Sequence, residues 1–159
     1  MKCWSRVLML IAGMLTLGSS VAQEVLNIPE DIKPILKKEM LAVEKGMQAL
    51  ISSIAKGEFE KTAMIGKQIQ ASYILKQSLT AEQMKQLHHS LPESFISQDH
   101  AFHQYAGMLA HAAEMKNTEV INFYFYKMNE SCVRCHSQYA QERFPAFSTQ
   151  TEKHKVHQH

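Results

Sequence analysis

The sequence FYKMNESCVRCHSQY, residues 125–139, carries the clearest structural signal in this chain of 159 residues. Its apolar and chemically distinctive residues recur at steps of three and four, which is the spacing of one face of an α-helix. The same pattern extends from about Glu119 to Arg143, and Pro145 stops it. We therefore predict a long helix that buries this face. Its members are Phe125, Met128, Cys132, Cys135, His136 and Tyr139.

Three other long helices are predicted upstream, because apolar residues again recur at helical spacing. Their approximate spans are 29–57, 59–77 and 93–116. A capping box formed by Thr80 and Gln83 predicts a short helix between the second and third of them, and Thr118 is the predicted N-cap of the last helix. The links are short, so we predict an all-α fold, an antiparallel up-down four-helix bundle.

Cys132, Cys135 and His136 form the pattern C-x-x-C-H, by which haem c is attached to proteins. Cysteines three residues apart lie on one helix face about one turn from each other, so both can form thioethers with a single porphyrin. His136 is then held beneath the iron. The sequence thus predicts one covalent haem c on the C-terminal helix, with His136 as the proximal iron ligand. The neighbours on the same face that we expect to line the haem pocket are Phe125, Met128 and Tyr139.

Two other chemistries use a Cys-x-x-Cys pair. A redox-active dithiol lies at the start of a helix near a βαβ unit, whereas this pair lies late in a long helix. A structural zinc site requires four ligands, and His136 supplies a third without an obvious fourth nearby. Haem attachment is therefore favoured over both alternatives.

Residues 1–22 have the composition of a secretory signal peptide. Lys2 and Arg6 give it a positive start, residues 7–17 are apolar, and small residues lead to a cleavage site after Ala22. An uncleaved membrane anchor is the alternative, but the apolar run is shorter than the ~20 residues that a span requires. We expect export to the periplasm and no membrane span after cleavage.

The net charge of the mature chain limits the classes of partner that it can bind. The sequence has 17 basic and 15 acidic residues, and removal of Lys2 and Arg6 with the leader leaves 15 of each. Nucleic-acid binding requires a strongly basic face, so this class is excluded. Residues 23–147 are predicted to form the haem domain, and residues 148–159 a polar, His-containing tail that we expect to be disordered.

The chain resembles the class II cytochromes c, the cytochrome c′ family. The resemblance is most specific from residue 95 to residue 139. The positions that carry it are Phe95, Phe102, Leu109, Ala112, Ala113, Phe125 and 131–139, whereas Leu36 and Ala140 stand where many members have a basic residue. It implies a four-helix bundle with the C-x-x-C-H motif in the last helix, and a possible homodimer.

The resemblance also places Met40 above the iron, as the distal ligand. In the family, Leu or Phe at this position leaves the iron five-coordinate, whereas Met fills the site. Helix geometry agrees, because His136 lies ~10 Å from the end of its predicted helix, while Met40 lies ~16 Å and Met47 ~27 Å into the antiparallel first helix. We therefore predict the low-spin, methionine-ligated type, which carries single electrons between redox partner proteins and is not an enzyme.

Several alternatives stay open. Met40 is an ordinary core methionine in one of them, and in that case the protein is a five-coordinate, gas-binding cytochrome for NO or CO. A weak peroxidase ranks last, because the sequence offers no distal acid–base pair. A surface metal site is a further alternative for the histidines that share a face of the 93–116 helix, although we favour a solvated face. These histidines are His100, His103 and His111.

Overall fold

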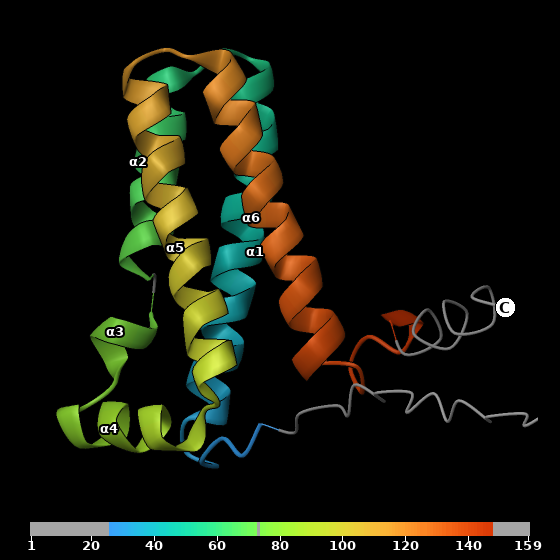
Figure 1. Ribbon diagram of the computed structural model, residues 1–159. Helices are drawn as coiled ribbons and strands as arrows, with labels where there is room; N and C mark the ends of the chain where they lie inside the picture. Colours follow the sequence, from blue (N-terminus) through green and yellow to red (C-terminus); the bar gives the residue numbers. More distant parts are fainter. Residues whose placement is uncertain (1–25, 73, 148–159) are drawn as a thin grey trace, which may run out of the picture.

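The structure is a computed structural model that describes residues 26–72 and 74–147. These residues contain six helices and no strand, which confirms the all-α prediction (Figure 1). The helices are α1 (Lys33–Ala55), α2 (Phe59–Ala71), α3 (Leu75–Ser78), α4 (Ala81–Ser90), α5 (Glu93–Glu114) and α6 (Thr118–Tyr139). The predicted signal peptide (1–22) and polar tail (148–159) lie outside the described residues.

The four long helices, α1, α2, α5 and α6, differ in how closely they pack. The most extensive contact is between α2 and α5, followed by α5 with α6 and then α1 with α2. α1 and α6 touch each other only lightly. The start of α1 and the end of α6 lie at the same end of the molecule, the lower end in Figure 1. The thinly packed side of the protein therefore lies between the first and the last long helix.

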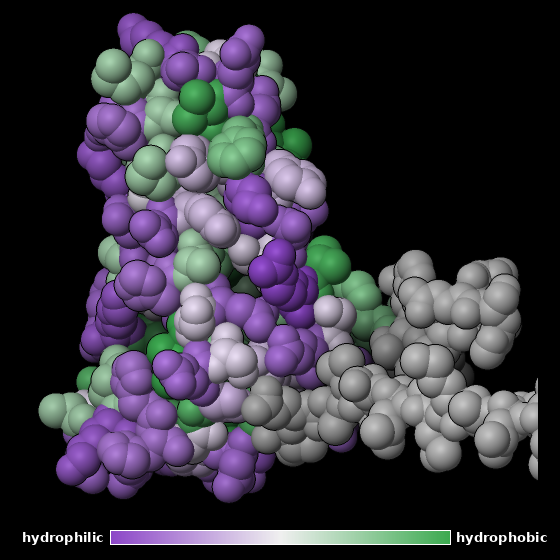
Figure 2. Space-filling view, viewed as in Figure 1, coloured by the Kyte–Doolittle hydropathy of each residue, from purple (hydrophilic) through white to green (hydrophobic). Residues whose placement is uncertain are grey.

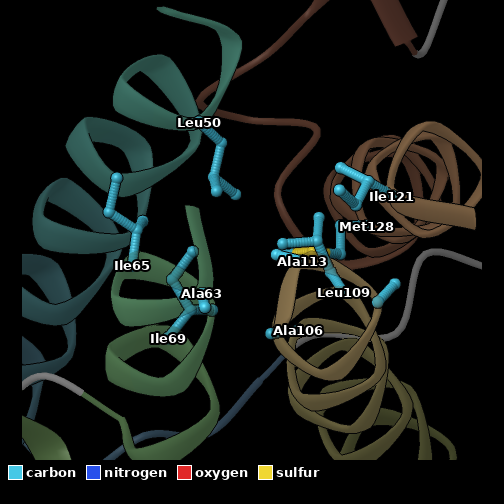
Figure 3. Close-up of a cluster of buried hydrophobic side chains, with 10 residues drawn as sticks. Leu50, Ala63, Ile65, Ile69, Ala106, Leu109, Ala113, Ile121 and Met128 are labelled. Atoms are coloured by element: carbon cyan, nitrogen blue, oxygen red, sulfur yellow. The ribbon is translucent and has the colours of Figure 1, made fainter. Parts of the chain in front are cut away.

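The core lies where side chains from the four long helices meet, as Figure 3 shows. Leu109, Ile121 and Met128 are fully buried there. α2 approaches α5 closely at Gly66, where an added Cβ would lie 2.9 Å from the main-chain oxygen of Ala106. Hydrophilic residues predominate on the outer face drawn in Figure 2, as expected of helices that bury one face.

α1 begins later than predicted but ends where expected. Its first residue is Lys33, because residues 29–32 form a turn in which the Pro29 carbonyl accepts hydrogen bonds from the amides of Ile32 and Lys33. Gly57 has a φ of +67°, a left-handed conformation that glycine adopts without a steric penalty. The prediction that Gly57 terminates this helix is consistent with that conformation.

The helix predicted over residues 59–77 is broken, and the prediction of one continuous helix is wrong. α2 ends at Ala71, and Ser72 has a φ of 63°. The carboxylate of Glu39, which is only 1% exposed, stabilises the break. It accepts hydrogen bonds from Ser72 Oγ (2.9 Å) and from the main-chain amides of Ile74 (2.6 Å) and Leu75 (3.0 Å). A group on α1 thus replaces the hydrogen bonds that α2 would otherwise supply to itself.

The capping predictions have mixed outcomes. Thr80 and Gln83 form the predicted capping box at the start of α4. The N-cap of α6 is Asn117, whose Oδ1 accepts from the amide of Val120 at 3.1 Å, so the choice of Thr118 is wrong. α6 also ends at Tyr139 and not at Arg143. Among the described helices, none has both the length and the apolar character that a membrane span requires.

Candidate functional site

The C-x-x-C-H motif occupies the last turns of α6. Cys132 and Cys135 are free thiols, each partly buried, and stand one helical turn apart. His136 follows directly and is also partly buried. The local helix predicted from the sequence therefore presents the two sulfur atoms and the imidazole within two turns of the chain.

The surroundings of the two thiols keep them protonated. Burial raises the pKa of Cys132. Burial, together with the nearby negative charge of Asp99, raises the pKa of Cys135 to about 11. Redox-active Cys-x-x-Cys pairs react through a thiolate whose pKa is lowered. The environment of this pair is the opposite of the one that dithiol redox chemistry uses.

The imidazole of His136 is held in its neutral form. Burial lowers its pKa, and the positive charge of Arg143 lowers it further. A neutral imidazole keeps a nitrogen lone pair, which is the form that binds a metal ion. His136 is therefore ready to act as a ligand at neutral pH.

The chain beyond α6 covers one face of this imidazole. The rings of His136 and Phe144 are stacked, with their centroids 4.5 Å apart and their planes inclined by 23°. Phe147 meets Phe144 edge-on, and the Arg143 guanidinium lies 5.8 Å from the centre of the Phe144 ring. Helical spacing does not predict this contact, because the contact depends on a turn after the end of α6.

The three residues predicted to line a haem pocket occupy different places. Met128 is fully buried in the main core, and Phe125 is half-buried against that core. Tyr139 is buried between α6 and α5, where its hydroxyl donates to Ser94 Oγ at 2.7 Å and its ring meets Phe95 edge-on. Tyr139 therefore ties the end of α6 to the start of α5, and Met128 belongs to the core cluster.

Met40 lies on α1 and is 42% exposed, whereas Met47 is half-buried against the core. The ends of α1 and α6 differ from the predicted ones, so the distances of Met40 and His136 from those ends are both shorter than predicted. Met40 is now seven residues from the start of α1, ~10 Å, and His136 three residues from the end of α6, ~5 Å. The structure thus places Met40 and His136 on two helices that contact each other only lightly, toward the same end of the molecule.

The histidines of α5 are not gathered into a metal site. Among the described residues, no three His, Cys, Asp or Glu side chains come together in a way that could hold a metal ion. His103 was expected to face solvent, but its side chain is only 15% exposed and its Nδ1 lies 2.6 Å from the main-chain oxygen of Ile69. Burial alone would lower its pKa, but the carboxylate of Asp99 and the carbonyl of Ile69 together raise it. His103 is therefore part of the contact between α2 and α5.

Comparison with protein-family models, with curated proteins and with solved structures gives no match for this chain. The candidate site is accordingly defined by its own chemistry. It consists of two protonated thiols and a neutral imidazole on α6 and an aromatic ring stacked on that imidazole, and Met40 on α1 is the predicted additional member.

Proposed function

We propose that this protein is an exported c-type cytochrome that carries single electrons through one haem c. The observation that carries the proposal is the C-x-x-C-H motif, presented on α6 with both thiols free. The proposed fold is an antiparallel up-down four-helix bundle of α1, α2, α5 and α6, similar to the class II cytochromes c. Haem would be bound covalently by Cys132 and Cys135.

The residues fit this group in three respects. Thioether attachment to two vinyl groups requires two separate thiols, and Cys132 and Cys135 are both free. Iron ligation requires a neutral imidazole, and the lowered pKa of His136 provides one. α1 and α6 contact each other only lightly. A group bound between them would therefore not disturb the extensive contacts of α5 with α2 and α6.

His136 would hold the iron from α6, and Met40 would hold it from α1. A haem bound there supplies one-electron oxidation and reduction of its iron. The chain would keep both ligands in place in both oxidation states, which limits the rearrangement that accompanies electron transfer. The apolar cluster around Met128 would exclude water from the buried side of the site. Redox proteins of the periplasm would be the partners.

A second candidate is a five-coordinate, gas-binding cytochrome. The observation that favours it is the 42% exposure of Met40, whose side chain is not fixed by packing in the way that Met47 is. If Met40 stays away from the iron, the distal position is open to NO or CO. The two candidates share the covalent haem and differ only in this ligand.

The test is to express the full chain together with a haem-attachment system and to record spectra of the purified protein. Haem that stays on the polypeptide in acidified organic solvent supports attachment at Cys132 and Cys135, and haem that extracts freely contradicts it. A low-spin ferric spectrum with a weak near-infrared band from sulfur–iron ligation supports the electron carrier. A high-spin spectrum in the unmutated protein would favour gas binding. Met40→Leu and Met47→Leu form a matched pair, of which only the first should remove the band.

A further inference from the structure

The chain turns back on itself directly after α6. The main-chain amides of Arg143 and Phe144 both donate to the carbonyl of Ala140, at 3.0 and 2.9 Å. This turn brings the Phe144 ring over the imidazole of His136, with 4.5 Å between the centroids. The contact joins two residues that are eight positions apart and lie on different segments, so helix periodicity does not produce it.

Several contacts hold the Phe144 ring in place. Phe147 meets it edge-on, with an angle of 67° between the planes, and the amide of Phe147 donates to the carbonyl of Phe144 at 3.0 Å. The Arg143 guanidinium lies 5.8 Å from the ring centre, within the range of a cation–π contact. Phe144 and Phe147 are both half-buried. The segment 140–147 thus packs its two phenylalanine rings against each other and against the end of α6.

The imidazole of His136 has no hydrogen-bond partner within residues 26–72 and 74–147. A histidine that binds a metal through one nitrogen usually donates its other N–H to a carboxylate, a carbonyl or water, and this second contact fixes the plane of the ring. At His136 the contact that the structure provides is the stacked face of Phe144. A ring stacked on one face of the imidazole restricts rotation of the imidazole plane, because rotation would push the imidazole edge into the stacked ring.

We infer that Phe144 is a positioning residue for the proximal ligand, and that its stack sets the plane of the His136 imidazole when His136 binds the haem iron. This inference rests on the proposed function. It adds that the segment after α6 completes the proximal side of the site, although it lies outside the C-x-x-C-H motif. The role is assigned to the ring of Phe144, since this ring stacks on His136 and the ring of Phe147 meets Phe144 edge-on.

The experiment compares F144L with its matched control F147L in the haem-loaded full chain. The two variants remove one ring each from the same segment, but only F144L removes the stack on His136. In ferric low-spin haem proteins, the paramagnetic NMR shifts of the haem methyl groups depend on the plane of the axial imidazole. We expect F144L to change the order or spread of these shifts more than F147L does. F144Y, which keeps the ring, should retain the pattern of the unmutated protein.

A second measurement follows the stack itself in the haem-free chain. The Phe144 ring current should move the ring-proton resonances of His136 upfield, and F144L should remove this displacement. If the haem-methyl pattern of loaded F144L equals that of the unmutated protein, Phe144 leaves the imidazole when haem is attached, and the inference is wrong. If the unmutated chain attaches no covalent haem, the proposed function fails, and the positioning role fails with it. Circular dichroism of all three variants shows whether the helices are intact.

Discussion

Replacement of Glu39 by alanine should destabilise the protein strongly, because this carboxylate accepts hydrogen bonds from the segment that joins α2 to α3. Glu39 accepts hydrogen bonds from Ser72 Oγ and from the amides of Ile74 and Leu75. Hydrogen bonds to a charged group contribute ~1.5–3 kcal/mol each to stability. Ile74 and Leu75 are only half-buried, so water can replace part of what is lost. We expect Glu39→Ala to lower the free energy of unfolding by ~3–5 kcal/mol, from a total of ~5–15 kcal/mol for a typical domain.

The assay is urea denaturation followed by helical circular dichroism, on the haem-loaded chain and on the haem-free chain. Glu39→Gln keeps one acceptor oxygen and should lose less than Glu39→Ala. Glu44→Ala is the matched control on the same helix, since Glu44 is exposed and its carboxylate accepts from Gln48 at 3.3 Å. It should change stability by no more than ~0.5 kcal/mol. A loss below ~1 kcal/mol in Glu39→Ala would show that the break in α2 does not depend on this carboxylate.

Met40→Ala should abolish the sulfur–iron band and speed CO binding while covalent haem is retained, whereas Met47→Ala should cost ~2–3 kcal/mol of packing without changing the spectrum. Gly66→Ala should cost ~1–3 kcal/mol in thermal melts, because its Cβ would lie 2.9 Å from a main-chain oxygen of α5, and an unchanged melting temperature would contradict this. His103 has a raised pKa in the folded chain, through Asp99 and against the effect of burial. Its contribution to stability should be full below a pH of about 6.5 and should be lost as the pH rises through the folded pKa. His103→Gln should flatten this part of the stability profile.

Local signals explain why most helices were predictable. Apolar spacing indicated the four long helices, and the capping box of Thr80 and Gln83 acts entirely within one turn. The break at Ser72 was missed because its acceptor, Glu39, lies 33 positions earlier in the chain. The choice between Asn117 and Thr118 as N-cap was missed because both side chains can fill that role, and only the backbone decides.

The candidate site also has one part that the sequence predicts and one part that depends on the tertiary structure. Cys132, Cys135 and His136 are contiguous, so the sequence contains their spacing in full. The stack of Phe144 on His136 depends on a turn at Ala140, at a point where helix-forming residues continue and the pattern predicts more helix. The raised pKa of Cys135 depends on burial and on Asp99 of α5, and therefore also requires the tertiary structure.

The uneven packing of the four long helices implies that they differ in how easily they open locally. α2, α5 and α6 form the closely packed part of the core, and neighbouring helices in this group are joined by short connections or by the small helices α3 and α4. α1 is held mainly through α2, so its first half should open more often than α5, with faster amide hydrogen exchange. The start of α1, which includes Met40, should therefore open while the end of α6, with its two cysteines, remains folded.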